Sequence, residues 1–152
     1  VTSDHDRALW HAQRDEFTLT EIKQRADRYP NDLLIRFELG EILFRLGKYA
    51  EAGQEFQKAQ PHPNKRLPAM MYLGQCFARR GMNDLAVRRL QEALKEKAVF
   101  DDEKKEVVYN LGSVLESMDK KEDAIEQFKL IYSVDAGYKD VGAKVDAYYA
   151  AQ

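Results

Sequence analysis

Three Leu-Gly pairs, each followed at a fixed distance by an alanine, constrain this chain more than any other feature. The pairs are Leu39-Gly40, Leu73-Gly74 and Leu111-Gly112. Thirteen positions after each leucine stands an alanine, and four positions after the alanine stands a large apolar residue; these are Ala52, Ala86 and Ala124, then Phe56, Leu90 and Phe128. A unit repeated at this length indicates a solenoid, in which neighbouring units bury one continuous core. Because solenoids present extended surfaces, the pattern favours recognition of another polypeptide over catalysis.

The spacing of the pairs identifies the kind of unit. It is 34 residues from Leu39 to Leu73 and 38 residues from Leu73 to Leu111. The first value is the period of a helix–turn–helix repeat, and the second is that period with four residues added. We expect the additional four residues to lie around Val99 to Asp102.

The first complete unit resembles the tetratricopeptide repeat. Its segment LGEILFRLGKYAEAGQEFQKA carries the family's characteristic residues at Leu39, Gly40, Gly47, Tyr49, Ala52, Phe56 and Ala59. The second and third units keep most of these positions, with Asp119 in place of the turn glycine in the third. Aspartate tolerates the left-handed conformation that such a turn requires. The resemblance implies an all-α fold, an α-solenoid built as a right-handed superhelix of antiparallel helix pairs.

We expect one tetratricopeptide domain over residues 1–152. Its parts are a partial N-terminal repeat at 4–32, complete repeats at 33–66, 67–104 and 105–136, and a C-terminal capping helix at 137–152. The phrase Asp-x-Gly-Tyr-Lys-Asp-Val at residues 135–141, which leads into the capping helix, is similar to the ends of tetratricopeptide modules in multidomain bacterial proteins. We therefore expect a module from a larger bacterial protein, and the start at Val1 instead of Met agrees with this.

The partial repeat is predicted to contain two helices. Residues 5–16 form the first, with Ala8, Leu9, Ala12 and Trp10 facing inward. Thr18 and Glu21 match a capping box, which predicts that a second helix begins near Leu19 and ends near Tyr29. Its apolar residues are Leu19, Ile22, Ala26 and Tyr29. In the capping helix, the apolar side is expected to consist of Tyr138, Val141, Val145 and Tyr148.

Composition and motifs disfavour several classes of function. Lys and Arg total 24 against 26 Asp and Glu, so the formal charge is −2 and no global basic field attracts nucleic acid. The single cysteine, Cys76, is expected in the core, and His5, His11 and His62 share no ligand spacing, so we expect no metal site and no cofactor. The acidic run Asp101-Asp102-Glu103 is interpreted as a helix cap. No catalytic motif is present, and we expect no enzyme activity.

The resemblance also places a binding surface. In this family the first helix of each unit lines the concave side, and the residues two before, two after and five or six after the leucine point into the groove. The predicted groove residues are Phe37, Glu41, Phe44, Arg45, Met71, Gln75, Arg79, Tyr109, Ser113 and Glu116, joined by Ala78 and Ser117. Phe37, Met71 and Tyr109 share one register, so they either form an apolar track for a peptide or helix or pack against the neighbouring unit.

One subgroup of the family clamps the terminal carboxylate of chaperone tails. The positions at which it carries its clamp residues hold Phe37, Glu41, Met71, Gln75, Glu106 and Asn110, and only Asn110 matches an asparagine register. We therefore expect no carboxylate clamp.

The predicted function is a non-catalytic scaffold that binds a peptide segment or partner helix of another protein in the concave groove. Two alternatives stay open. The basic pairs Lys65-Arg66, Arg79-Arg80 and Arg88-Arg89 suit an RNA-binding helical repeat, although no aromatic stacking groups are interleaved with them, so we favour a protein partner over nucleic acid. Self-association of the module is the other alternative. No apolar run reaches membrane-spanning length, and we favour the cytoplasm, with any targeting segment expected in the parent chain.

Overall fold

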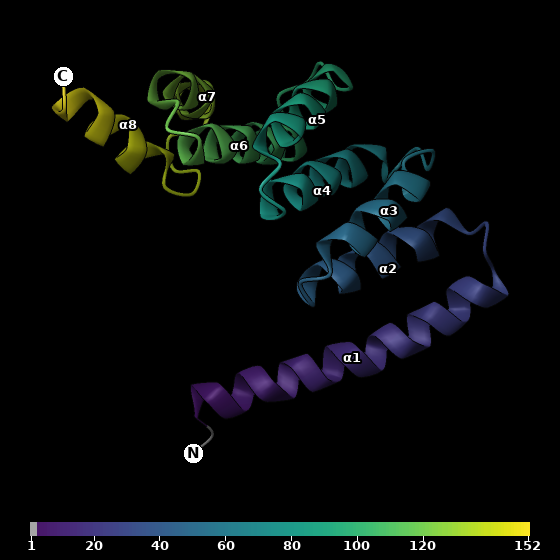
Figure 1. Ribbon diagram of the computed structural model, residues 1–152. Helices are drawn as coiled ribbons and strands as arrows, with labels where there is room; N and C mark the ends of the chain where they lie inside the picture. The colour runs from purple at the N-terminus through teal and green to yellow at the C-terminus, as the bar shows by residue number, and fades with distance from the viewer. Residues whose placement is uncertain (1–2) are drawn as a thin grey trace. The chain divides into compact units, whose positions relative to one another are not determined.

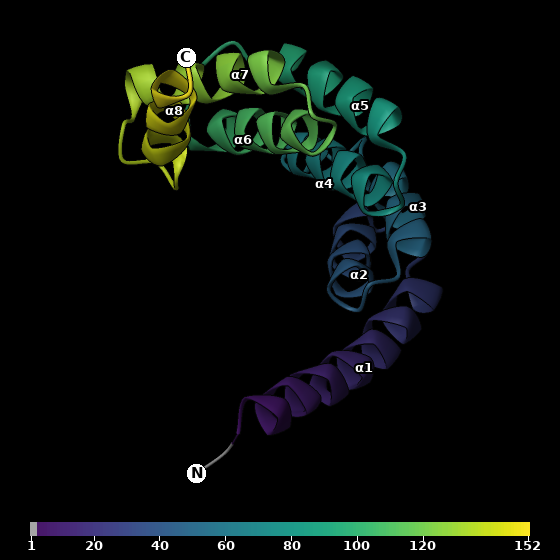
Figure 2. The same ribbon diagram turned by 60° about the vertical axis from the view of Figure 1, so that its left-hand side comes forward.

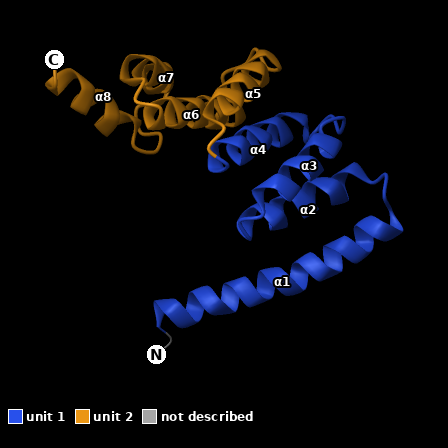
Figure 3. Ribbon diagram, in the orientation of Figure 1, with its two compact units in different colours: residues 1–80 blue, residues 81–152 orange. Residues whose placement is uncertain are grey.

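The computed structural model describes residues 3–152, and over this range the chain contains eight α-helices and no strand. The chain divides into two compact units, residues 1–80 and residues 81–152 (Figure 3). Unit 1 contains α1 (Asp4–Arg28), α2 (Leu33–Arg45), α3 (Tyr49–Ala59) and α4 (Arg66–Arg79). Unit 2 contains α5 (Asn83–Lys95), α6 (Asp102–Ser117), α7 (Lys121–Val134) and α8 (Val141–Ala150). The all-α prediction is confirmed.

Within each unit, helices that follow one another in sequence pack together (Figure 1). The pairs α2–α3 and α6–α7 make the most extensive contacts, and glycine allows a close approach in both. A Cβ atom placed on Gly40 would lie 2.8 Å from Cε1 of Phe56, and one placed on Gly112 would lie 2.7 Å from Cε1 of Phe128. Both distances are shorter than van der Waals contact. The small residue of the repeat is therefore required where a phenylalanine of the second helix packs on the first.

The turns inside these two pairs have the same hydrogen-bond pattern. After α2, the N–H of Lys48 donates to the carbonyl of Leu43 and the N–H of Gly47 to that of Phe44, at 2.9 and 3.0 Å. After α6, Lys120 and Asp119 make the corresponding bonds, both at 3.0 Å. This arrangement requires a left-handed residue, and φ is 76° at Gly47 and 59° at Asp119. The expectation that aspartate replaces the turn glycine is confirmed.

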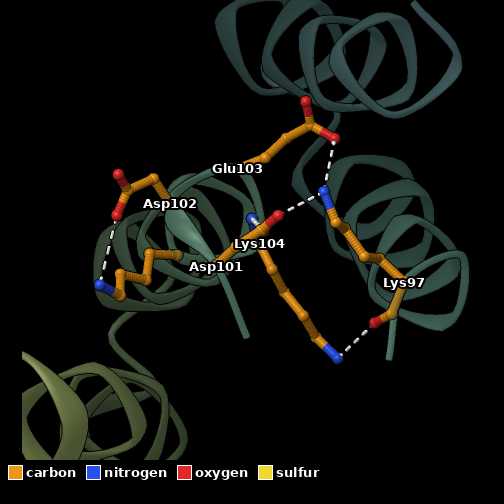
Figure 4. A network of polar contacts seen from close by, with 6 residues as sticks. Lys97, Asp101, Asp102, Glu103 and Lys104 are labelled. Carbon is orange, nitrogen blue, oxygen red and sulfur yellow. Dashed lines mark hydrogen bonds and ion pairs between the residues drawn. The ribbon is translucent and has the colours of Figure 1, made fainter. Parts of the chain in front are cut away.

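Aspartates begin two of the helices. The carboxylate of Asp32 accepts hydrogen bonds from the N–H groups of Leu34 and Ile35, at 3.0 and 3.1 Å. Asp101 accepts from the N–H of Lys104 at 3.0 Å and also pairs with Lys97, so that the capping prediction for the acidic run is confirmed (Figure 4). The ammonium of Lys104 in turn donates to the carbonyl of Lys97 at 2.6 Å. These bonds connect the end of α5 to the start of α6.

The N-terminal segment differs from its prediction, because one helix of 25 residues replaces two (Figure 2). Thr18 does not cap a second helix: its hydroxyl donates to the carbonyl of Arg14 at 2.9 Å, as a threonine in a helix interior does. No glycine or proline lies between residues 4 and 28 to interrupt the helix. Leu19, Ile22 and Ala26 are buried as expected. The predicted inward residues of the first half are all exposed, and so is Tyr29, which follows the helix end; these exposed residues are Ala8, Leu9, Trp10, Ala12 and Tyr29.

The four additional residues of the second repeat do not form a loop insertion. The connections between α3 and α4 (60–65) and between α5 and α6 (96–101) have equal length. Instead α5 has 13 residues against 11 in α3, and α6 has 16 against 14 in α4. Each of the two helices is thus longer by two residues, and together they account for the four.

Helix α8 packs on α7 with the predicted apolar side. Val141 and Val145 are buried, and Tyr138 and Tyr148 are half-buried. Cys76 is also buried as predicted, and this burial raises the pKa of its thiol to about 11. The expected repeat boundaries and the single domain stay predictions.

Candidate functional site

Five aromatic rings in unit 1 form a continuous series from the core to the surface. We call Phe37, Phe56, Tyr72, Phe44 and Tyr49 the aromatic series. The ring of Phe56 stacks on that of Tyr72 at 4.6 Å between centroids, and Phe37 meets Phe56 edge to face at 5.5 Å. Phe44 meets Tyr72 at 5.4 Å and Tyr49 at 5.2 Å, again edge to face. Rings from α2, α3 and α4 are thereby held in one rigid assembly.

Arg79 lies at the exposed end of the aromatic series. Its guanidinium carbon is 5.8 Å from the ring centroid of Phe44 and 5.8 Å from that of Tyr49, which is within the range of a cation–π interaction. The Arg79 side chain is exposed, and over residues 3–152 it forms no ion pair. The end of α4 thus holds an uncompensated positive charge on a fixed aromatic support.

The other charged groove residues of unit 1 have partners. Glu41 accepts a hydrogen bond from the hydroxyl of Tyr72 at 3.3 Å. Arg45 lies 3.7 Å from the carboxylate of Asp15 on α1. Met71 and Gln75 are half-buried on α4. Seven of the eight groove residues predicted for this unit, Ala78 included, are thus at least partly accessible.

Phe37 is the exception, because its side chain is only 4% exposed. It contacts the rings of Phe56 and Tyr72, and the ammonium of Lys65 lies 5.0 Å from its ring centroid. Of the two roles expected for Phe37, packing inside the protein therefore holds. Its side chain cannot belong to an apolar track that a ligand touches. The physical reason is the stacked pair formed by Phe56 and Tyr72, which draws the Phe37 ring into the core.

In unit 2, polar side chains of α6 bind the segment that leads into α8. The hydroxyl of Tyr109 donates to Asp140 at 2.7 Å, and the hydroxyl of Tyr138 donates to Glu106. Glu106 also pairs with Lys139 at 2.7 Å. We call Glu106, Tyr109, Tyr138, Lys139 and Asp140 the latch. Tyr109 was predicted as a groove residue, and the structure places its hydroxyl in this intramolecular contact.

The latch changes the pKa values of its members. Burial and the hydrogen bond to Asp140 raise the pKa of Tyr109 to about 12. The same hydrogen bond lowers the pKa of Asp140. Burial alone would raise the pKa of Glu106, but the hydrogen bonds from Lys139 and Tyr138 outweigh it and lower that pKa. Each shift favours the protonation state that closes the latch at neutral pH.

A cavity of about 640 Å³ opens beside the latch, between α7 and α8. Its floor is Ala124, Ile125 and Phe128, and Ala143 and Ala147 form the facing wall. Of the predicted groove residues, Glu116 lines this cavity, where it pairs with Lys144 at 2.8 Å. Ser113 is half-buried on the same helix.

Sequence reasoning missed some of the residues at these surfaces. Tyr72 was not singled out, although it connects Glu41 to the aromatic series. Ala143 and Ala147 were missed as well, and a signal for them existed. Val145 follows Leu111 by 34 residues, one repeat period, so the positions two before and two after it belong to the groove register.

Some members of the predicted basic pairs already have intramolecular partners. Arg89 pairs with Glu92 at 3.1 Å, Lys65 lies on the Phe37 ring, and Arg66 has a partner. Over the described residues, each helix is either too short or too polar to cross a lipid bilayer.

Comparison with solved structures shows the fold. A crystal structure of MamA has a TM-score of 0.77 at 19% sequence identity, with 99% of this chain and 85% of that chain covered. A second MamA structure has a TM-score of 0.74 at 20% identity, covering 97% and 76%. YrrB, described as a TPR protein with an unusual peptide-binding site, has a TM-score of 0.67 at 19% identity, covering 95% and 73%. No curated protein matches the sequence.

Family models give the same result at the level of sequence. Three models of the tetratricopeptide repeat match residues 21–66, 68–96 and 106–138. Together they cover most of the chain, including the three units recognised from the Leu-Gly pairs. The chain therefore belongs to the tetratricopeptide repeat family.

Proposed function

We propose that this chain is a non-catalytic scaffold that binds a peptide segment or a partner helix on the face where α2 adjoins α4. Proteins with tetratricopeptide repeats bind other proteins or peptides and are typically non-catalytic, which supports the general function. YrrB, a structural neighbour, is described as having a peptide-binding site. The face itself is chosen from the contacts in unit 1.

One observation carries the choice of face. The side chains of Phe44 and Arg79 come from different helices, touch each other and remain accessible. Glu41 and Arg45 lie on α2 near Phe44 in sequence, and Met71 lies two helical turns before Arg79 on α4, so the face combines apolar surface with charge of both signs. Surfaces of this composition suit an extended segment, whose apolar side chains pack on the rings while charged groups select the register.

The intramolecular contacts of α6 indicate that unit 2 contributes less to ligand binding than unit 1. Tyr109 and Glu116 already bond to Asp140 and Lys144, so a ligand would have to displace these contacts before it could use the same atoms. Tyr109, Ser113 and Glu116 stay predictions as binding residues.

A binding measurement with matched variants tests the proposal. Peptides are selected from a random library displayed on phage, with the whole chain as bait, and the affinities of the enriched peptides are measured by calorimetry. Met71→Glu is expected to weaken binding about tenfold or more, because it places an unpaired charge beside the apolar part of the face. Gln54→Glu adds the same charge on the exposed side of α3 and is expected to leave affinity unchanged. Enrichment of no peptide, or equal affinity in both variants, would contradict the proposal.

The alternatives predict different results in the same preparation. RNA binding predicts retention of a labelled RNA oligonucleotide that falls steeply as salt is added. Self-association predicts a sedimentation coefficient that rises with protein concentration.

A further inference from the structure

The Arg79 side chain forms no ion pair with any residue of 3–152. Glu41 is bound by Tyr72, and Asp15 by Arg45. The residues next in sequence to Arg79 and to Tyr49 are Arg80 and Lys48, and within residues 3–152 neither forms an ion pair. The end of unit 1 at which α2 and α4 finish and α3 begins thus holds Lys48, Arg79 and Arg80 against Glu51 in the first turn of α3. Positive charge predominates there, in a chain whose formal charge is −2.

The aromatic support prepares the Arg79 guanidinium for a ligand. A guanidinium packed on rings has lost part of its rotational freedom and part of its hydration, while its N–H groups remain available at the edges of its plane. Less entropy is then lost when those N–H groups donate to an acceptor. The acceptors that match the planar fork of arginine in both geometry and charge are carboxylate and phosphate groups, and a peptide supplies the carboxylate.

We propose that Arg79 recognises an aspartate or glutamate side chain of the bound peptide, and that Phe44 and Tyr49 pack against an apolar residue next to that acidic residue. This inference rests on the proposed function, because it names the chemistry of the ligand at the same face. Arg79 acts as the specificity-determining residue of the face.

The packing of the rings favours an acidic peptide over a nucleic acid. Nucleobases bind to proteins by stacking flat on exposed aromatic rings. Here the Phe44 ring lies under Arg79 and meets Tyr49 and Tyr72 at 70° and 66° between ring planes, so these three neighbours leave it only partly exposed. An aliphatic side chain can lie along the outer edge of such an assembly, whereas a base needs an open face.

The test compares peptide selection by three forms of the whole chain. The natural chain and its Arg79→Gln variant are each used as bait for the same random peptide library. Arg88→Gln is the matched control, because Arg88 is exposed, lies on α5 and forms no ion pair within the described residues. Thermal melting of each form checks that the substitutions leave the fold intact.

The natural chain and Arg88→Gln are expected to enrich peptides that carry Asp or Glu beside an apolar residue. Arg79→Gln is expected to enrich peptides without that acidic preference. The affinity for an acidic peptide selected by the natural chain should fall about tenfold in Arg79→Gln, and the effect should vanish when the acidic residue of the peptide is changed to its amide.

Three results would overturn the inference. If peptides are enriched without an acidic preference, the inference fails and the proposed function stands. If no peptide is enriched by any form, both fail. Retention of an RNA oligonucleotide that is lost in Arg79→Gln and kept in Arg88→Gln would show that Arg79 serves phosphate groups instead.

Discussion

Gly40 occupies a place where a methyl group would collide with the ring of Phe56. Gly40→Ala is therefore expected to lower the free energy of unfolding by about 1–3 kcal/mol, because the ring or the α2–α3 pair must move to accommodate the Cβ atom. Denaturant unfolding followed by circular dichroism measures this change.

Gly53 provides the matched comparison in the same unit. It also lies inside a helix, but a Cβ atom there would come no closer than 3.4 Å to Cδ1 of Leu73. Alanine favours the helix by up to about 1 kcal/mol over glycine, so Gly53→Ala is expected to be neutral or stabilising. Equal destabilisation by both substitutions would show that close helix packing is not the reason for the repeated glycine.

The substitution Tyr109→Phe tests the latch, because its effect on the free energy of unfolding should depend on pH. The Tyr109 hydrogen bond to Asp140 is expected to contribute about 0.5–1.5 kcal/mol at neutral pH. Because the folded pKa of Tyr109 is raised to about 12, this contribution is complete below the unfolded value of about 10 and declines as pH rises toward 12.

Asp140, the acceptor of the same hydrogen bond, sets the lower pH limit of its contribution to stability. Its folded pKa is lowered, so its contribution is present above the unfolded value of about 3.9 and declines as pH falls below it. The stability difference between the natural chain and Tyr109→Phe should therefore be largest between about pH 5 and 9. A difference that stays constant across the whole range would contradict the role of the latch.

At the level of single residues, the sequence predicted which positions must be small for the helices to pack. It did not predict which large side chains are buried and which are accessible. The need for Gly40 and Gly112 follows from their recurrence at one register, and the structure supplies the phenylalanine that requires it. The burial of Phe37 could not be predicted in the same way, because Phe37, Met71 and Tyr109 share a register while only Phe37 has a stacked ring pair beside it. Contacts among side chains from three helices decide such a case.

The second half of α1 packs against α2, whereas the first half contains no buried residue. Leu19, Ile22 and Ala26 are buried, whereas Trp10 and Phe17 are 55% and 66% exposed. Helical segments without tertiary packing are only marginally stable in water. Amide hydrogens of residues 8–14 are therefore expected to exchange with solvent much faster than those of residues 20–27, as measured by hydrogen exchange with mass spectrometry. Equal protection of both halves would show that the first half has support of its own.

Element boundaries were the least predictable part of the fold. The stripe of Leu19, Ile22 and Ala26 was visible in the sequence, but the capping box at Thr18 suggested a break that does not exist. A threonine hydroxyl can either cap a helix or bond within one, and the choice depends on whether the preceding residues are also helical. The additional residues of the second repeat were likewise expected around Val99 to Asp102, and α5 and α6 contain two each instead.

At the scale of the molecule, the repeat pattern was sufficient for the fold class and for the family. Both follow from the recurrence of small and large residues, which a sequence shows directly. The candidate site was less predictable. Arg79 and Phe44 were named from register, but their contact with Tyr49 depends on the packing of α2, α3 and α4 against one another.

The most direct test of the central claim is a nuclear magnetic resonance titration of the isotope-labelled whole chain with an enriched peptide. The account predicts chemical-shift changes that concentrate on the exposed residues of α2 and α4, including the side-chain signals of Met71 and Arg79. Changes confined to α1, to the outer side of α3 or to the cavity between α7 and α8 would contradict it.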